Sequence, residues 1–204
     1  MYRRTLLSLP LTTLLLSGCS RSRRQNEVLT GYLKAFIEGE LRLVQRTGYG
    51  TWLTEQLVVE SRVSGISSLI GWKSVEEIRK SLSHVQTSAA DDLLAHRNDA
   101  TPVQLDGSLL PASTRVDYIS RECLQALLKK KPPQDGVWHV IEETYPGAGG
   151  VVSFSPIGFS LDGEQAVFGV GFSCGPVCGN GVGVLMRKRA AGWTVDQQRD
   201  LWIS

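Results

Sequence analysis

Residues 165–183 read QAVFGVGFSCGPVCGNGVG, and this stretch decides the fold that the sequence predicts. Large apolar side chains recur at every second position, which is the period of a β-strand. One face of the strand would carry Ala166, Phe168, Val170 and Phe172, and the other would carry Val167, Gly169 and Gly171. We therefore expect a central strand that is covered on both faces, with Phe168 and Phe172 in the core.

Turn residues surround this strand and divide the last sixty residues into short segments. Asp162-Gly163 precedes it, and Asp-Gly is a strong hairpin signal because glycine adopts positive φ without a steric cost. The loop from Cys174 to Gly181 follows it, and Ala191-Gly192 marks a further turn. The sequence thus predicts an antiparallel β-meander of four short strands, at residues 151–159, 165–172 and 183–189 and in a last segment from 193 to 204.

Cys174 and Cys178 are separated by three residues in this loop, and we expect them to form a disulfide that closes the turn. A redox pair is usually Cys-x-x-Cys at a helix N-terminus, and a zinc site needs two more ligands, so both are weaker interpretations. The disulfide would leave Cys123 as a buried free thiol on a helix with Leu124 and Leu127. The rival pairing joins Cys123 to one of the turn cysteines.

The same region resembles a family of uncharacterised bacterial exported proteins. The motif Cys-Gly-x-x-Cys-Gly-x-Gly at 174–181 is the most specific part of the resemblance. Its other parts are Tyr145-Pro146-Gly147, Gly158-Phe159-Ser160, Gln165-Ala166-Val167 and Trp202-Ile203-Ser204. The resemblance implies a shared fold over about the last sixty residues, and it carries over no catalytic residue.

Residues 1–18 have the parts of an export signal. Arg3 and Arg4 form a basic start, and an apolar run follows that is shorter than the roughly 20 residues of a membrane-spanning helix. The run ends in Leu16-Ser17-Gly18-Cys19, which resembles the lipobox of bacterial lipoproteins. This resemblance implies cleavage before Cys19 and lipidation of Cys19. An ordinary signal peptide or an uncleaved anchor is the alternative.

The lipobox also implies a location in the cell envelope. One acyl chain binds membranes only marginally, and bacterial lipoproteins carry a diacylglycerol and often a third acyl chain. Ser20 follows the cysteine, where an aspartate commonly favours the inner membrane of Gram-negative bacteria. We therefore expect the protein at the outer membrane, facing the periplasm, if the host is Gram-negative.

We expect residues 19–26 to form a short polar tether between lipid and domain. Its arginines, Arg21, Arg23 and Arg24, would be solvated, contact anionic headgroups, or do both. The chain has 22 basic and 20 acidic residues, and loss of Arg3 and Arg4 with the signal would leave 20 of each. This balance argues against a nucleic-acid partner, which usually shows as a basic excess.

Residues 27–204 are expected to form one α+β domain, with N-terminal helices packed on the C-terminal antiparallel meander. A first helix begins at residue 25 or 26, and its apolar side chains recur at helical spacing. Ser74 and Glu77 form a capping box for a second helix. Further helices are predicted at 89–96, 122–130 and 137–144, and a strand at 115–119. Residues 51–60 are predicted as a strand, with a helix as the alternative. The apolar face of the first helix carries Val28, Leu29, Tyr32, Leu33, Phe36 and Ile37.

The sequence shows no recognisable catalytic pattern. The three histidines, at 84, 96 and 139, form no metal pair at helical spacing, and no Gly-x-Ser-x-Gly elbow is present. We expect no metal and no cofactor, and a non-enzymatic role in binding or assembly with another envelope protein. The alternatives are an envelope enzyme, either a thiol oxidoreductase or a hydrolase, and a binder of small ligands.

Overall fold

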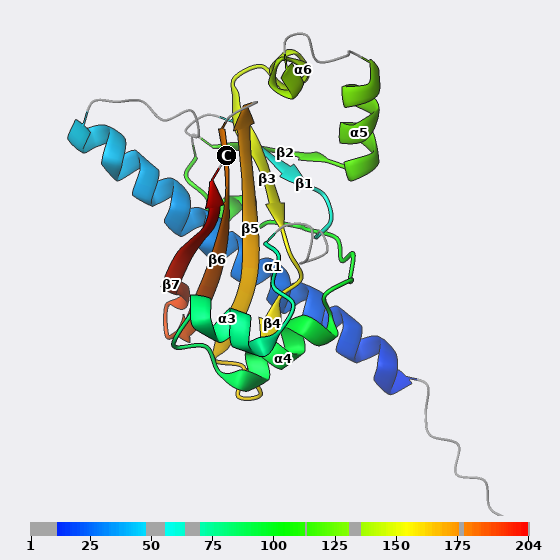
Figure 1. Ribbon diagram of the computed structural model, residues 1–204, viewed down its shortest axis with the longest axis vertical. Helices are drawn as coiled ribbons and strands as arrows, with labels where there is room; N and C mark the ends of the chain where they lie inside the picture. The colour runs from blue at the N-terminus through cyan, green and yellow to red at the C-terminus, as the bar shows by residue number, and fades with distance from the viewer. Residues whose placement is uncertain are drawn as a thin grey trace, which may run out of the picture.

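The computed structural model describes residues 12–47, 56–63, 70–112, 114–130, 136–175 and 178–203. One seven-stranded sheet organises the domain, with helices on both of its faces (Figure 1). Six strands follow the spatial order β2-β1-β3-β5-β6-β7, and β4 pairs with β5 beside this path. The strands are β1 (Gln56–Glu60), β2 (Arg115–Ile119), β3 (Ala148–Phe154), β4 (Gly158–Phe159), β5 (Gln165–Gly175), β6 (Cys178–Arg189) and β7 (Gly192–Ile203).

The sheet is mixed. β1 runs parallel to both of its neighbours, β2 and β3. From β3 onward all pairings are antiparallel, so β5, β6 and β7 form the predicted C-terminal meander. The predicted α+β class is confirmed. The structure adds that the two strands from the first part of the chain extend the same sheet.

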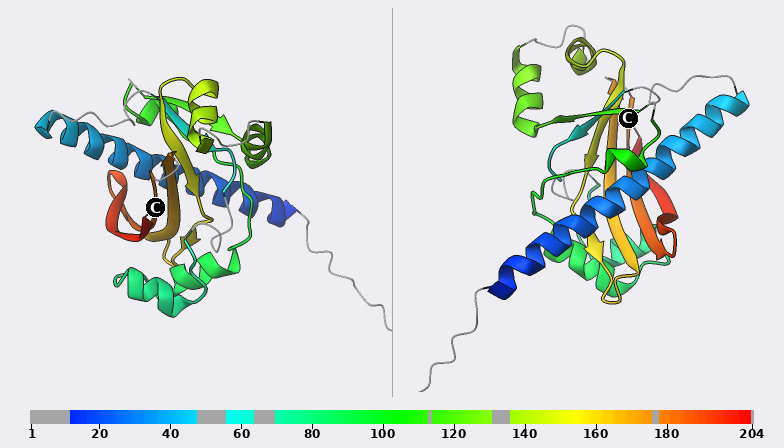
Figure 2. Two further views of the ribbon diagram at one scale, coloured as in Figure 1. Left: turned by 45° about the horizontal axis from the view of Figure 1, so that its top comes forward. Right: turned by 180° about the vertical axis from the view of Figure 1, so that it is seen from behind.

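The helices are α1 (Thr12–Thr47), α3 (Val75–Ser81), α4 (Thr87–Ala95), α5 (Arg121–Lys130) and α6 (Gly136–Thr144), with a 3₁₀ turn η1 at Gly107–Leu109. Seen from behind, α1 crosses one face of the sheet diagonally (Figure 2). The other helices pack on the opposite face, where α3 and α4 cover β5 and β6, and α5 and α6 cover β1 and β3.

The largest core cluster lies between α1 and the sheet. Tyr32 of α1 meets Phe168 of β5 edge to face, with the ring centroids 5.6 Å apart. Phe168 and Phe172 are both buried, as their alternation predicts. The predicted apolar face of α1 is confirmed, and only Phe36 among its six members is partly rather than fully buried.

Two glycines let bulky side chains cover the opposite face of the meander. A Cβ added at Gly169 would lie 2.3 Å from Cδ1 of Ile70, and one at Gly183 would lie 2.5 Å from the Trp72 ring. Val167 and Leu185, which neighbour them, are fully buried against α3 and α4. β5 is therefore covered on both faces, as expected.

Several predicted element bounds are wrong in detail. The run 151–159 is two strands, β3 and β4, because Pro156 lies between them and cannot donate to the strand ladder. The last segment is one long strand, β7, which continues through Asp196 and Asp200. Ser74 is the predicted N-cap, with its Oγ accepting from the Glu77 amide at 3.3 Å. The Glu77 carboxylate accepts from the amide of Lys73, at 2.7 Å, rather than from that of Ser74, so the capping box is only half formed.

The predicted start of the first helix at residue 25 or 26 is wrong, because α1 begins at Thr12 and continues through residues 19–26. Gln25 in this segment is buried, with 3% of its surface exposed. Arg21 of this segment bonds Asp92 and the Ile157 carbonyl, and Arg24 lies over the Phe159 ring, and such remote partners cannot be predicted from local composition.

Cys174 and Cys178 flank the turn between β5 and β6. Ser173 pairs with Gly179 and Gly175 with Cys178, with an irregularity between these two pairs. The side chains of Cys174 and Cys178 lie outside the described part of the structure, so their disulfide stays a prediction. Cys123 is a free thiol, but it is exposed rather than buried. Leu124 and Leu127 face the core, and Cys123 points away because adjacent helical residues are about 100° apart.

Candidate functional site

The first part of α1 docks on α4 and β4 through Arg21. Its Nη1 and Nη2 donate to the two carboxylate oxygens of Asp92 at 3.3 and 3.0 Å. Nη2 also donates to the backbone carbonyl of Ile157 at 2.8 Å. A guanidinium matches a carboxylate in this two-point geometry, which is stronger and more directional than a single contact. Arg21 therefore fixes the orientation of the start of α1.

Asp92 is the centre of this arrangement. Besides Arg21, its carboxylate accepts a hydrogen bond from the Phe159 amide at 2.8 Å. The Nδ1 atom of His96, one turn along α4, lies 3.2 Å from its other oxygen. The side chains of Arg21 and Asp92 are only 29% and 25% exposed, so water screens the pair incompletely. One carboxylate thus joins α1, α4 and β4.

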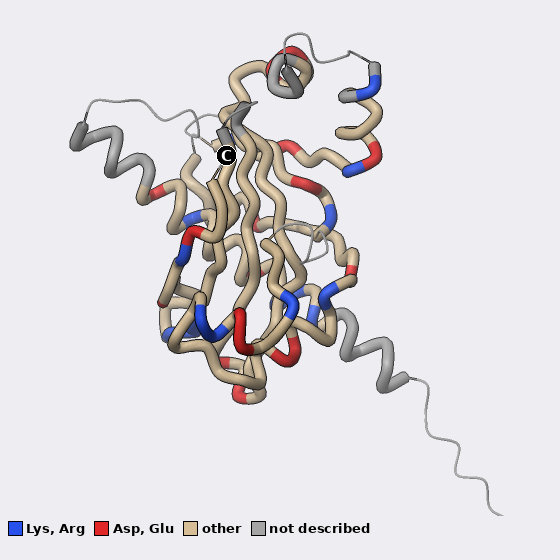
Figure 3. The backbone as a smooth tube through the Cα atoms, viewed as in Figure 1, with Lys and Arg blue, Asp and Glu red and all other residues tan. Residues whose placement is uncertain are grey.

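The remaining arginines of the basic cluster have different environments. The guanidinium of Arg24 lies over the Phe159 ring, 4.2 Å from its centroid, in a cation–π contact. Arg23 is 84% exposed and pairs with Glu27 one turn along α1. The expectation that all three arginines are solvated or face headgroups is wrong for Arg21 and Arg24, because the side chains of these two residues contact other groups of the domain. Basic and acidic positions are mixed around this end of the molecule (Figure 3).

Cys19 lies in α1 only two residues before Arg21. At about 1.5 Å per helical residue, the two positions are about 3 Å apart along the helix axis. A lipid on Cys19 would therefore be connected to the folded domain with almost no flexible spacer. The side chain of Cys19 is outside the described part of the structure, and its lipidation stays a prediction.

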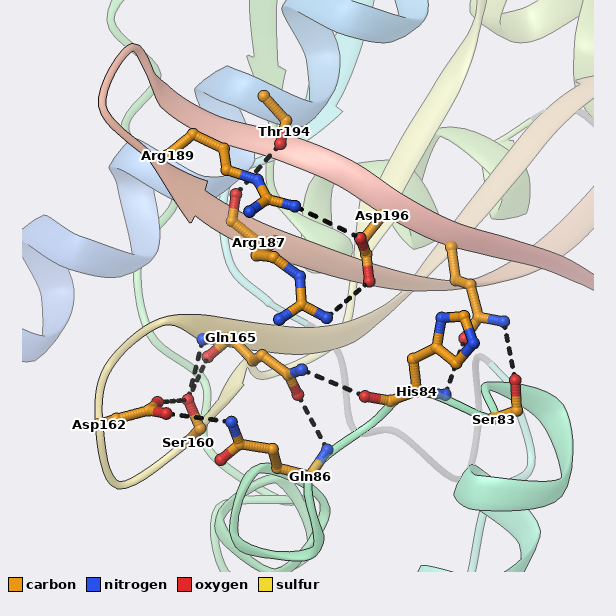
Figure 4. Close-up of polar contacts among 11 residues, drawn as sticks. Ser83, His84, Gln86, Ser160, Asp162, Gln165, Arg187, Arg189, Thr194 and Asp196 are labelled. Carbon is orange, nitrogen blue, oxygen red and sulfur yellow. Dashed lines mark hydrogen bonds and ion pairs between the residues drawn. The ribbon is translucent and has the colours of Figure 1, made fainter.

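A second polar cluster holds the β4–β5 hairpin against the loop before α4 (Figure 4). The Asp162 carboxylate accepts from the Ser160 hydroxyl at 2.5 Å and from Nε2 of Gln86 at 3.0 Å. These hydrogen bonds, that from Ser160 first, lower the pKa of Asp162 to about 2. Gln165 bridges the same parts, since its Oε1 accepts from the Gln86 amide and its Nε2 donates to the His84 carbonyl.

This cluster contains serine, histidine and aspartate, but their arrangement is not that of a hydrolase. A catalytic serine needs a base within hydrogen-bond reach of its hydroxyl. The Ser160 hydroxyl instead donates directly to Asp162, and the residue is only 3% exposed. His84 contributes backbone groups to the cluster, accepting from Gln165 and donating to Gln197. The arrangement is structural, and we call the cluster of Gln86, Ser160, Asp162 and Gln165 the clasp, because it holds the β4–β5 hairpin against the start of α4.

The clasp continues on the neighbouring hairpin of β6 and β7. Nη2 of Arg187 donates to the Asp196 carboxylate at 3.0 Å. This hydrogen bond is the largest cause that lowers the pKa of Asp196, and partial burial opposes it. Gln197 of β7 reaches back to Ser83 with its Nε2, at 3.0 Å. Both hairpins at this end are thus tied to the segment between α3 and α4.

A small cleft lies where β1 and β2 end. It has a volume of about 170 Å³, and the residues that follow both strands line it. Nη1 of Arg62 donates to the Ala100 carbonyl on its wall, and Glu122 lies in the first turn of α5. The pKa of Glu122 is lowered, mainly by backbone and Ser120 hydrogen bonds and further by Arg62 and Arg121. The lining residues are Ser61, Arg62, Val63, Asn98, Asp99, Ala100, Ser120, Arg121 and Glu122.

Within the described residues, no group of three His, Cys, Asp or Glu side chains is placed to hold a metal ion. Among the same residues, no helix combines the length and apolarity needed to cross a membrane. Of the residues predicted as sites, Cys19, Cys174 and Cys178, the structure describes the backbone, which lies in α1, β5 and β6. The sequence did not predict the Arg21–Asp92 pair, because no local motif indicates a contact between residues so far apart in the chain.

Comparisons of the chain with protein-family models, with curated proteins and with solved structures find no match.

Proposed function

We propose that this protein is a lipoprotein of the bacterial cell envelope that binds a partner at the membrane rather than catalysing a reaction. The Arg21–Asp92 ion pair, two residues beyond the lipobox cysteine, is the observation that carries the proposal. A helix that starts at the lipid and is locked into the domain keeps the domain at the bilayer. That geometry suits a protein whose partner also lies at or in the membrane.

The polar groups of the described region support a binding role. The best-connected carboxylates are engaged by the fold itself, since Asp92 holds Arg21, Asp162 holds Ser160, and Asp196 holds Arg187. An acid or base that works in catalysis must be within reach of a substrate proton. These carboxylates hold elements of the fold together, and their surroundings favour a rigid scaffold over a reaction centre.

A second candidate function, binding of a small polar ligand, is favoured by the cleft at the ends of β1 and β2. In sheets with parallel strands, ligands bind beyond the carboxyl ends of the strands. The cleft lies at that edge and carries the guanidinium group of Arg62 beside the start of α5. The Arg121 guanidinium also lines it, and its Nε lies 3.5 Å from the Glu60 carboxylate. A small carboxylate or phosphate would fit this chemistry.

Thermal melting tests the second candidate with inorganic phosphate, acetate and succinate as probes. A rise in Tm with one of them that is lost in Arg62→Gln would favour a ligand site, because a ligand that binds only the folded state stabilises it. If no probe shifts the Tm, or if Arg62→Gln shifts equally, the cleft is a surface feature without this role.

Fractionation of bacteria that express the full chain tests the main proposal. The wild-type protein should sediment with membranes and be released by detergent. Cys19→Ser should appear in the soluble envelope fraction. Cys123→Ser is the matched control, because Cys123 is an exposed free thiol, and this variant should stay with the membranes. If Cys19→Ser remains in the membrane fraction and detergent releases it, the lipoprotein proposal is wrong.

A further inference from the structure

Leu161 is an apolar side chain at the tip of the hairpin between β4 and β5, and 95% of its surface is exposed. It is the most exposed large apolar side chain in the described part of the chain, and Ile203 follows with 78%. A single exposed leucine needs no special explanation by itself. Its setting in the hairpin and its position relative to the lipid-bearing helix carry the inference.

The hairpin tip is held in one conformation. The Gly163 amide donates to the Ser160 carbonyl at 2.9 Å, and Gly163 has a φ of 71°, which favours glycine. The Leu161 amide donates to the Ser88 hydroxyl of α4 at 3.3 Å, and Asp162 is held by Gln86. The apolar side chain therefore stays extended into solvent, because the turn cannot rearrange without breaking these contacts.

The same hairpin lies beside the part of α1 that follows Cys19. A Cβ built on Gly163 would be 3.2 Å from Nη1 of Arg24, and Arg24 is five residues beyond Cys19. Ser88 and Asp92 lie one turn apart on α4 and contact Leu161 and Arg21 respectively. Figure 1 and the right view of Figure 2 place the first turns of α1 and this hairpin toward the same end of the sheet.

We propose that the hairpin tip, led by Leu161, inserts into the surface of the bilayer that holds the Cys19 lipid. This inference rests on the proposed function, because it needs the lipid on Cys19. The lipid brings the start of α1 to the headgroup level, and the Arg21–Asp92 pair prevents the domain from turning away. Arg23, exposed on the same part of α1, would face the lipid phosphates.

Insertion by an anchored domain needs little intrinsic affinity. The lipid keeps the hairpin at a high effective concentration at the surface, so one apolar side chain suffices to select an orientation. The domain would then present the opposite end of the sheet, where β7 ends at Ile203, to the periplasm. The inference thus assigns a membrane side and a partner side to the molecule.

Quenching of tryptophan fluorescence by brominated lipids tests the orientation. The lipidated full chain is reconstituted in vesicles of phosphatidylethanolamine and phosphatidylglycerol, with and without brominated phosphatidylcholine. The variants are L161W and, as the matched control, I203W at the other end of the sheet. Both positions are exposed, so neither variant should change the Tm, and the emission of the native tryptophans is subtracted using the wild type.

The emission added by L161W should shift to shorter wavelength on vesicles and be largely lost with brominated lipid. The emission added by I203W should keep its wavelength and intensity. If L161W is not quenched, or if both variants are quenched equally, the inference is overturned. Flotation of the same vesicles separates this from the proposed function: protein that floats without quenching refutes only the orientation, and protein that does not float refutes both.

Discussion

The guanidinium of Arg21 and the carboxylate of Asp92 meet at two points, with N–O distances of 3.3 and 3.0 Å. The two residues are 71 positions apart in the chain. Their contact fastens α1, the helix that contains Cys19, to α4. The composition of residues 19–26 is that of a polar linker, but this contact holds the segment against the domain.

Arg21→Ala should lower the free energy of unfolding by about 1–3 kcal/mol, because Asp92 would lose its main counter-charge while remaining partly buried. In a domain of this size, that corresponds to a loss of about 2–4 °C in Tm for each kcal/mol. Each substitution is made in the Cys19→Ser protein, and its Tm is compared with that of Cys19→Ser alone. Arg23→Ala is the control, because its pair with Glu27 is exposed and should contribute at most about 0.5 kcal/mol. Equal effects of both substitutions would contradict a docked helix start.

Gly158→Ala should destabilise the contact between β4 and α4. A Cβ at this position would lie 2.1 Å from the Ala89 carbonyl oxygen and 2.5 Å from Cβ of Leu93, so the strand would have to move away from the helix. Overpacking of this kind costs about 1–3 kcal/mol. Gly39→Ala is the matched control in an exposed part of α1, where nothing lies within 4 Å of the new Cβ. That change should stabilise the protein by up to about 1 kcal/mol. A tolerated Gly158→Ala would place β4 farther from α4 than the structure does.

Asp162 should give the protein a pH-dependent contribution to stability. Its folded-state pKa is lowered from 3.8 to about 2, first by the Ser160 hydrogen bond. The carboxylate therefore stabilises the fold above about pH 4, and this contribution is lost as the pH falls toward about 2. Thermal melts of wild type and Asp162→Asn should differ most above about pH 4 and converge below it. A Tm difference that stays constant down to about pH 2 would contradict the clasp.

The cysteines should differ in reactivity. Cys123 is an exposed free thiol and should be alkylated rapidly in the folded protein taken directly from the envelope. Cys174 and Cys178 should resist alkylation and appear as one crosslinked peptide in mapping without reduction. A crosslinked peptide pair that contains Cys123 would contradict this pattern. Rapid alkylation of both turn cysteines would favour the thiol oxidoreductase alternative.

The meander and the helices could be predicted because their signals are local. The alternation around Phe168, the Asp162-Gly163 turn and the Ser74 N-cap each specify structure within a few residues. All three appear in the structure, with Gly163 at a φ of 71° and Ser74 accepting from the Glu77 amide. The prediction that Cys123 is buried is wrong because adjacent positions on a helix face different directions, so a buried residue can be followed by an exposed one.

The sheet order and the docking of α1 could not be predicted because they depend on distant partners. Residues 56–60, QLVVE, predict a strand but do not say which neighbours it takes, and β1 pairs in parallel with two strands from much later in the chain. Likewise, the sequence around Arg21 and Arg24 is typical of a solvated linker, and only the fold brings Asp92 and Phe159 beside these two arginines. Only the tertiary structure supplies those partners.

The N-terminal peptide of the protein purified from membranes tests the central claim most directly. Mass spectrometry after proteolysis should find a peptide that begins at Cys19 and carries the added mass of a diacylglycerol, with or without a further acyl chain. No peptide from residues 1–18 should remain on the mature chain. A peptide that begins elsewhere, or a Cys19 with an unmodified thiol, would contradict the lipid anchor on which the proposed function rests.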